Sequence, residues 1–309
     1  MPVTAATIDV VVATRDRPMA LGRLLGDLEA QTLAPTSVAL VDDSSSAVDW
    51  ALRHPALPLT VDRPERRLLI TAAKNRGAAK GTAEFLAFID DDNSVPPTLL
   101  EALVRDLRSD PKRGAVMPGV LYHRRPEIVW VYATPFGASR WTFEYVGRNR
   151  RRDPALEGRI LPTDALPNLS IVRRAAYRDV GGFEERLPVN SSADFCQRLK
   201  RAGWDVVADS GVLTRHDVDP PDVPGYWAEH TVTDPQRARR EVADWFLFQR
   251  RWNAQRSAFG ARASFHALEF VLPQLLGITV RPESRRLALL AAMIQGYRDG
   301  LGMRLPPLA

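Results

Sequence analysis

The sequence predicts an α/β protein built on a doubly wound, mostly parallel sheet, followed by a C-terminal helical appendage. Short runs of β-branched and aromatic residues alternate with segments in which apolar residues recur at helical spacing. A helix that crosses from each strand to the next leaves the strands parallel. Two of the apolar runs end in aspartates, at the place where ligands bind in open α/β sheets.

The first half of the chain supplies this alternation element by element. Residues 8–14 form a continuous apolar run, and Leu21, Leu24, Leu25 and Leu28 then follow at helical spacing. Further strands are expected at 38–41, 59–61 and 85–89, and further helices near 48–53, over about 71–80 and from Pro96 onward.

The run at 85–89 is the most informative, because it ends in Asp90-Asp91-Asp92. Like charges this close repel one another unless a cation neutralises them. Carboxylate oxygens suit Mg²⁺ or Mn²⁺, and such ions usually bridge to substrate phosphates. A solvated acidic turn is the alternative for the triplet taken alone. The second strand ends in Asp42-Asp43, which would open onto the same edge of the sheet. No G-x-G-x-x-G follows the first strand and no P-loop is present, which argues against a dinucleotide-binding or Walker-type site.

The next part of the chain is less regular. From about residue 114 to 170 the alternation fades, with a strand expected at 129–132 and a basic run at 148–152 on a predicted loop. A long loop in a compact domain is more often functional or mobile than inert. Strands at 168–172 and 206–208 then flank a helix over about 193–202, which Gly203 ends.

Beyond residue 234 the character changes, and we expect a main domain over 1–234 and a helical region over 235–309. Helices are predicted at 235–256, 263–276 and 282–301, with many arginines and no lysine. Trp245, Phe246, Phe248 and Trp252 add an aromatic stripe. The stripe either packs the appendage onto the main domain or belongs to a basic surface that lies on anionic lipid or grips a lipid diphosphate.

The composition narrows the class of protein. The chain has 309 residues, of which 45% are hydrophobic and 26% charged, as in ordinary well-packed proteins. Cys196 is the single cysteine, which excludes an internal disulfide and fits a reducing cytosol. There is no signal-peptide pattern and no run near the roughly 20 apolar residues of a membrane span, so we expect a cytoplasmic protein. The net charge of +5 suggests anionic partners, but does not choose among nucleotide phosphates, lipid phosphates and nucleic acid.

Five motifs, in order, resemble those of the family-2 glycosyltransferases, which have the GT-A fold and use nucleotide-diphosphate sugars. Together they cover about residues 8–216. They are the strand and turn at 10–17 (VVVATRDR), Gln31-Thr32 with 41–45 (VDDSS), 73–77 (AKNRG), 89–93 (IDDDN), and an acceptor-side half at 173–185 and 194–203. The segment 296–301 is similar to the tails of relatives that extend polysaccharides or lipid-linked sugars, including rhamnosyltransferases.

The resemblance implies roles for the residues at matching positions. On the donor side, Asp43 would bind the base, Thr14 and Arg15 would line the nucleoside pocket, Asp90 or Asp91 would contact ribose, and Lys74 would face the nucleotide. Asp92 would hold Mn²⁺ or Mg²⁺ on the diphosphate, with His216 as a second metal or diphosphate contact. A solvated Lys74 and a structural His216 are the alternatives. The implied partners are a nucleotide-diphosphate sugar and a glycan, lipid-linked or small-molecule acceptor, and no nucleic acid.

The implied reaction transfers the sugar with inversion. The cation stabilises the departing nucleoside diphosphate as a Lewis acid, and a carboxylate takes the proton of the acceptor hydroxyl on the opposite face. Ser191-Ser192 replace the family's usual Glu-Asp pair, so Asp194 is expected to be the base, with Glu184 or Glu185 as other candidates.

Two other classes of protein stay open. The serines also fit a non-catalytic protein that only binds nucleotide sugars. A nucleotidyltransferase is the remaining alternative, but it would need a glycine-rich phosphate-gripping loop after the first strand, and residues 13–18 contain no glycine. The sugar, the nucleotide, the acceptor and the oligomeric state are not specified by the sequence.

Overall fold

The computed structural model describes residues 6–137, 142–220, 234–254 and 283–306. The chain divides into two compact units. The first consists of Met1–Glu185 and Ser192–Pro220, and the second of Arg186–Ser191 and Pro221–Ala309. The second unit thus borrows a short segment that the sequence-based division after residue 234 assigns to the main domain.

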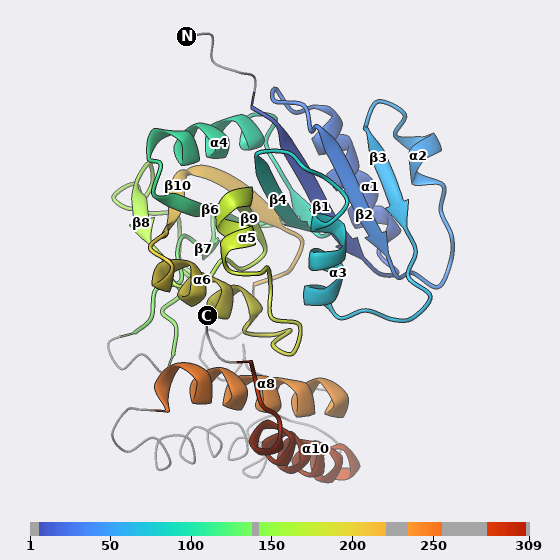
Figure 1. Cartoon of the computed structure of the whole chain (residues 1–309), viewed down its shortest axis with the longest axis vertical. Coiled ribbons are helices and arrows are strands. Elements are labelled where there is room, and N and C mark those ends of the chain that lie inside the picture. The colour runs from blue at the N-terminus through green and yellow to red at the C-terminus, as the bar shows by residue number, and fades with distance from the viewer. Residues whose placement is uncertain (1–5, 138–141, 221–233, 255–282, 307–309) are drawn as a thin grey trace. The chain divides into compact units, whose positions relative to one another are not determined.

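The first unit is an α/β fold, and the strands and helices predicted for its first half occur in the predicted order (Figure 1). Its first half consists of β1 (Ile8–Thr14), α1 (Pro18–Glu29), β2 (Ser37–Asp42), α2 (Trp50–Arg53), β3 (Leu59–Asp62), α3 (Ile70–Ala78), β4 (Phe85–Asp90), β5 (Asn93–Ser94) and α4 (Leu99–Ser109). Its second half consists of β6 (Arg113–Tyr122), β7 (Val129–Val131), β8 (Ile160–Pro162), β9 (Leu169–Arg173), α5 (Arg174–Asp179), α6 (Ser191–Arg201) and β10 (Asp205–His216).

The sheet has the strand order β3-β2-β1-β4-β9-β6-β10-β5. The first four of these strands are parallel, and β9 then enters antiparallel between β4 and β6. In the register of β1, Thr14 pairs with Asp42 and Ala13 pairs with Asp90. The carboxyl ends of β1, β2 and β4 therefore lie side by side, which is what positions the candidate site.

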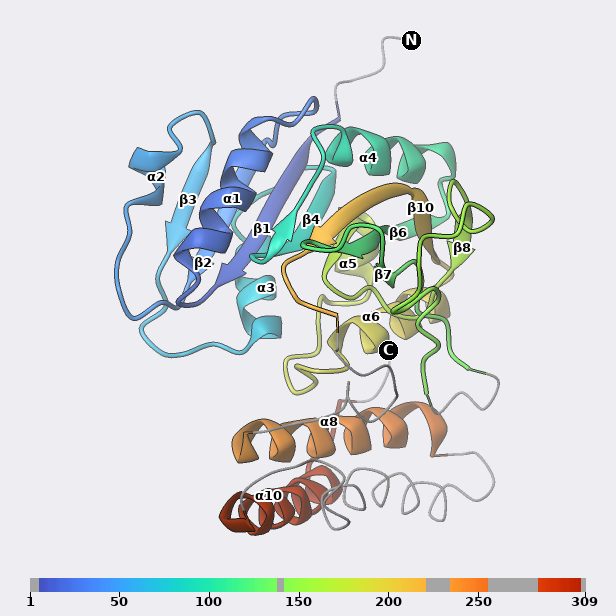
Figure 2. The same ribbon diagram turned by 180° about the vertical axis from the view of Figure 1, so that it is seen from behind.

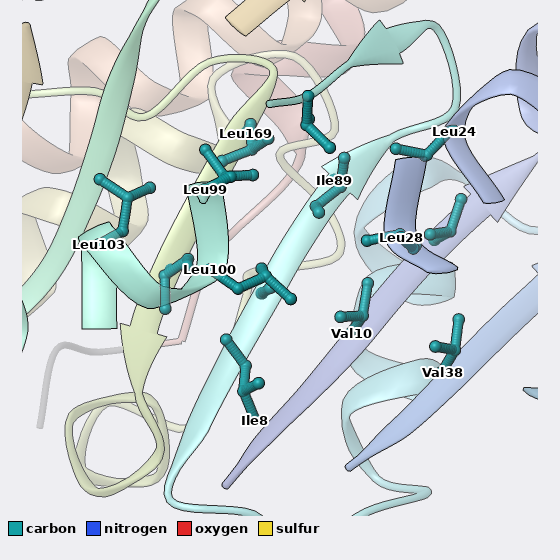
Figure 3. Packing of buried hydrophobic residues seen from close by; sticks show 14 of the residues in the cluster. Ile8, Val10, Leu24, Leu28, Val38, Ile89, Leu99, Leu100, Leu103 and Leu169 are labelled. Atoms are coloured by element: carbon teal, nitrogen blue, oxygen red, sulfur yellow. The ribbon is translucent and has the colours of Figure 1, made fainter. Parts of the chain in front are cut away.

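Helices cover both faces of the sheet. Side chains along a strand point alternately to opposite faces, so neighbouring residues of one strand pack into different cores. Val10 and Ile89 face one core with α1 and α4, whereas Val11 and Phe88 face the other with α3, α5 and α6. Figure 3 shows Leu24 and Leu28 of α1 and Leu99, Leu100 and Leu103 of α4 gathered over the strands on the first face. Figure 2 views the sheet from the α1 side. The doubly wound α/β prediction is confirmed.

Strand β6 is the main element that the sequence analysis missed. Its ten residues are almost all buried, yet the segment contains Pro118 and two glycines, which weaken a strand signal. Pro118 is tolerated because the ladder with β10 breaks its register there, between Asp209 and Leu213. The short elements β5, β8 and α5 were also not expected.

The second unit contains α8 (Pro235–Asn253) and α10 (Glu283–Gly302), close to two of the three predicted helices. The third prediction, at 263–276, lies outside the described residues. Ala238 and Val242 of α8 pack against Leu289 and Met293 of α10. Phe246, from the predicted aromatic stripe, is buried against Tyr297 with ring centroids 4.8 Å apart.

Two further contacts hold this unit together. Buried Asp244 of α8 accepts hydrogen bonds from the backbone N–H groups of Val189 (2.7 Å) and Asn190 (2.9 Å), which ties the borrowed segment to the helix. Gly300 of α10 lies so close to Ala243 that a Cβ there would crowd the carbonyl oxygen of Ala243. None of the helices among the described residues has the length and apolar character needed to cross a membrane.

Candidate active site

A cavity of about 350 Å³ lies at the carboxyl ends of β1, β2 and β4. Ligands of open α/β sheets bind at this edge. The lining residues come from the ends of the three strands, from the loop after β1 and from the segment before and within α3: Ala13, Thr14, Arg15, Arg17, Val41, Asp43, Arg67, Leu68, Ile70, Ala73, Asp90, Asp91 and Asp92. Of the residues predicted to bind the nucleotide or the metal, all but Lys74 and His216 line this cavity.

The loop after β1 is tied to the loop after β2. The carboxylate of Asp16 accepts hydrogen bonds from the backbone N–H of Ser45 (2.8 Å) and from its hydroxyl (2.7 Å). These bonds hold the pKa of Asp16 below its ordinary value. Asp16 also has a φ of 53°, in the left-handed region that Asp tolerates better than most residues. The two loops therefore form one wall, which presents Arg15 and Arg17 to the cavity.

The neighbouring aspartates Asp42 and Asp43 have different surroundings. Asp42 is buried, and Arg63 donates a hydrogen bond to it across 2.7 Å. The backbone N–H of Asp43 donates to the carbonyl oxygen of Thr14 (3.1 Å), and Asp43 lines the cavity. Asp42 thus supports the wall, and Asp43 is the carboxylate that a bound molecule would meet.

The three aspartates at the end of β4 each have at least one cationic or polar partner. Lys74 Nζ lies 2.9 Å from Asp90 Oδ1, so Lys74 reaches the site through Asp90. Thr14 donates a 2.7 Å hydrogen bond to Asp91, whose pKa is raised by burial in spite of Thr14 and Arg17. For Asp92, burial alone would raise the pKa, but His216 and Arg17 outweigh it, and the pKa is lowered. Asp92 is therefore more readily held ionised than Asp91.

Arg17 is the residue that the sequence analysis missed. Its Nη1 lies 3.1 Å from Asp91 Oδ1 and 2.6 Å from Asp92 Oδ2, so one guanidinium neutralises two carboxylates. Arg17 is the N-cap residue of α1 and makes no capping bond through its side chain, which leaves the guanidinium for the site. The basic turn at 15–18 was the available signal, but the sequence alone did not show which arginine faces the triplet.

His216, at the end of β10, reaches the same carboxylate. Its Nε2 lies 3.4 Å from Asp92 Oδ1, and its ring packs edge-on against Trp130 with centroids 4.9 Å apart. The backbone N–H of Asp217 donates to the carbonyl oxygen of Asp92 (2.8 Å), which fixes the two chain segments together. Residues 92 and 216, distant in sequence, thus meet at one point.

A divalent cation fits this arrangement. Among the described residues no group of three or more His, Cys, Asp or Glu side chains forms a metal cage. Mg²⁺ and Mn²⁺ usually take only one or two protein ligands and complete their coordination with water and substrate phosphates. Asp92 supplies the carboxylate oxygen and His216 a neighbouring imidazole nitrogen, so the residues suit an ion that is bound together with a diphosphate.

The comparison with protein families decides the assignment. The family model "Glycosyl transferase family 2" matches residues 9–181, more than half of the chain. The chain belongs to glycosyl transferase family 2. This confirms the resemblance found in the sequence.

Curated relatives agree with the family assignment. The chain is 26% identical over 181 residues to the uncharacterized glycosyltransferase YwdF of Bacillus subtilis, covering 57% of this chain and 62% of that protein. It is 27% identical over 215 residues to the pre-mycofactocin glycosyltransferase of Mycobacterium tuberculosis, covering 68% of this chain and 42% of that protein. The chain thus spans less than two thirds of the length of these relatives.

Solved structures confirm the GT-A type of fold. A mannosyltransferase of Pyrobaculum calidifontis, in complex with GDP-Man and Mn²⁺, superposes with a TM-score of 0.56 at 18% identity, over 97% of this chain and 88% of that one. TarS 1–349 of S. aureus, in complex with UDP-GlcNAc, has a TM-score of 0.60 at 16% identity, over 94% of this chain and 81% of that one. At these identities the likeness concerns the fold alone.

The residue expected to act as the base in this family 2 member is not at the cavity surface. The Asp194 side chain is fully buried, and Arg198 Nε donates to it across 2.8 Å. Of the two other carboxylates suggested by the sequence, Glu184 is half-buried, whereas Glu185 is exposed and accepts a 3.0 Å hydrogen bond from Asn75. Glu185 is thus exposed and held by α3, whereas Asp194 could act only after its ion pair opens.

Proposed function

We propose that the protein is an inverting, metal-dependent glycosyltransferase. It would move a sugar from a UDP or dTDP donor to a hydroxyl of a glycan, a lipid-linked sugar or a natural product. The observation that carries the proposal is the convergence of Asp43, Asp91, Asp92 and His216 at one sheet edge. A role in cell-wall or polysaccharide biosynthesis in the cytoplasm would follow from such acceptors.

The lining residues suit a nucleoside diphosphate laid across the strand ends. Asp43, after β2, would accept hydrogen bonds from the base, with Thr14 and Arg15 beside the nucleoside. Asp91, which Thr14 already orients, would accept a hydrogen bond from a ribose hydroxyl. The diphosphate would then lie near Asp92, two strands from Asp43 in the order β2-β1-β4.

The departure of the nucleoside diphosphate requires stabilisation of negative charge. Mn²⁺ or Mg²⁺, when bound at Asp92 and His216, supplies Lewis-acid stabilisation of that charge. Arg17 and Lys74 lie at the same edge, and each is paired with a carboxylate of the triplet. Both side chains would be close enough to donate to the diphosphate oxygens, where charge-assisted hydrogen bonds are strong.

The acceptor hydroxyl needs a carboxylate to take its proton, and the geometry supports Glu185 over Asp194. Glu185 is exposed, whereas Asp194 is buried against Arg198. General-base catalysis typically contributes about 10² to 10⁴ in rate, so we expect Glu185→Gln to lower turnover by at least about 100-fold with donor affinity kept. Asp194→Asn should instead lower the melting temperature. A stable Asp194→Asn variant without turnover would return the base role to Asp194.

A donor screen followed by a transfer assay tests the proposal. Nucleoside diphosphates are compared by thermal shift with and without Mn²⁺, since a ligand that binds only the folded state raises its stability. The best donor is then assayed for sugar transfer or hydrolysis. Asp92→Asn, which keeps the shape of the side chain, should abolish the Mn²⁺-dependent shift. Unchanged nucleotide affinity in that variant would refute the assignment. Metal-dependent binding without turnover with any donor would instead indicate a non-catalytic nucleotide-sugar-binding protein.

A peripheral membrane contact is a separate part of the proposal, and it rests on α10. Leu287, Ile294 and Leu301 recur every seven residues on this helix and are 71%, 52% and 49% exposed, and Arg298 is exposed between the last two. An apolar stripe with a basic side chain is typical of helices that lie in the surface of an anionic bilayer. Ile294→Ser should weaken co-sedimentation with vesicles of anionic phospholipid. Equal binding of both forms would remove this part of the proposal.

A further inference from the structure

A second cavity adjoins the donor cavity and has a strongly basic lining. It measures about 610 Å³ and lies along the segment 63–68, which connects β3 to α3 (Figure 1). The lining residues are Arg63, Pro64, Glu65, Arg66, Arg67, Leu68 and Arg76. Four guanidinium groups therefore face one carboxylate.

Two of these arginines are held in place by carboxylates outside the lining. Arg63 donates to buried Asp42, and Arg76 forms a two-point contact with Asp62, at 2.7 and 2.8 Å. The hydrogen bond from Arg76 and the neighbouring Lys80 lower the pKa of Asp62 to about 2. Both arginines are thus fixed side chains whose charge is already shared.

The other two arginines supply uncompensated charge. Arg66 and Arg67 are exposed and make no ion pair or hydrogen bond with any of the described residues. Like charges gathered in one concave site raise its electrostatic potential and attract an anion. Guanidinium groups match phosphate oxygens in paired hydrogen bonds, which makes phosphate the anion that this lining suits best.

The diphosphate of the donor does not account for this cavity. The metal-binding Asp92 follows β4, and β3 lies three strands away in the order β3-β2-β1-β4. Neighbouring strands lie about 4.8 Å apart, so the ends of β3 and β4 are separated by roughly 14 Å. Arg67 and Leu68 line both cavities, so the two cavities are contiguous at the nucleoside end of the donor site.

We propose that Arg63, Arg66, Arg67 and Arg76 form a second anion site, which binds a phosphate group of a ligand other than the sugar donor. The site does not depend on the donor function being correct, because its lining includes none of the metal-binding residues. The phosphate could belong to a soluble phosphate ester or to a phospholipid headgroup, which share the same chemistry. Ligand binding there would alter donor affinity through Arg67.

Titration of the full-length protein with inorganic diphosphate, in EDTA and followed by calorimetry, tests the site. We expect the double variant Arg66→Gln with Arg67→Gln to bind diphosphate at least tenfold more weakly than the parent protein. Arg178→Gln with Arg201→Gln removes the same charge from two other exposed positions and should bind as the parent does. Arg17→Gln, which removes a cation of the donor site, should also leave diphosphate binding intact.

The outcomes distinguish this site from the donor site, and a soluble phosphate ligand from a phospholipid headgroup. Unchanged diphosphate affinity in the Arg66 and Arg67 double variant, or an equal loss in the control double variant, would overturn the proposal. Loss of binding in Arg17→Gln would place diphosphate at the donor site and would also overturn it. Co-sedimentation with vesicles of anionic phospholipid then identifies the source. If the double variant loses vesicle binding, the ligand is a phospholipid headgroup. If the double variant loses diphosphate binding but binds vesicles as the parent does, the ligand is a soluble phosphate.

Discussion

Arg17 makes the most direct prediction about the metal site, because it occupies the carboxylates that a divalent cation needs. Its Nη1 contacts Asp92 at 2.6 Å and Asp91 at 3.1 Å. A cation that binds Asp92 must displace or repel this guanidinium. Replacement by glutamine removes the charge and leaves a shorter polar side chain. We therefore expect Arg17→Gln to bind Mn²⁺ more tightly than the parent protein when no nucleotide is present.

The size of the effect follows from exposure. The Arg17 side chain is 56% exposed, so solvent screens its ion pairs, whereas Asp92 is only 15% exposed. Exposed pairs contribute about 0.2 to 1 kcal/mol, and the close contact with a mostly buried carboxylate points to the upper end. About 1 kcal/mol corresponds to a roughly fivefold change in the dissociation constant. The difference should shrink as ionic strength rises.

Free Mn²⁺ measured by electron paramagnetic resonance gives the affinity without any turnover. Arg105→Gln is the control, since Arg105 is 72% exposed and pairs with Glu101 on α4, so that its loss changes the net charge equally. With nucleoside diphosphate added, Arg17→Gln should bind nucleotide more weakly, because Arg17 then has phosphate oxygens to contact. Mn²⁺ affinity that stays the same or falls in the nucleotide-free variant would refute the displacement model.

Three other features make predictions. The pKa of Asp62 is lowered to about 2 from 3.8, so its contact with Arg76 stabilises the fold above about pH 4, and this stabilisation is lost as the pH falls toward 2. The difference in melting temperature between Asp62→Asn and the parent protein should therefore disappear over that range. A difference that does not change with pH would contradict this. Gly300→Val would crowd the backbone of Ala243, at a cost of about 1 to 3 kcal/mol, so limited proteolysis should cleave the second unit faster, and equal rates would show that α10 can shift. Burial raises the pKa of the Cys196 thiol, so iodoacetamide should label it only in denaturant, and labelling of the native protein would show that this core opens.

The local sequence was sufficient to predict the first half of the fold. The apolar run of β1 was predicted with its observed bounds, and the period of two in β1 and β4 sends alternate residues to opposite cores. Such strands are identified by neighbouring residues alone. Strand β6 escaped notice because Pro118 and its glycines are accepted only where the partner strand β10 breaks register, and no local pattern shows that.

The same division holds for the candidate site. The motif around Asp92 and its resemblance to family 2 were readable in the sequence, because spacing along one strand end decides which carboxylates cluster. Arg17 could not be selected over Arg15 from the sequence, since the choice depends on the loop geometry imposed by Asp16 and Ser45. The sequence by itself thus determined the fold class, the family and the acidic edge of the sheet. Only the tertiary structure brought His216 within 3.4 Å of Asp92 and buried Asp194 against Arg198, because strand register and helix packing decide which distant side chains meet.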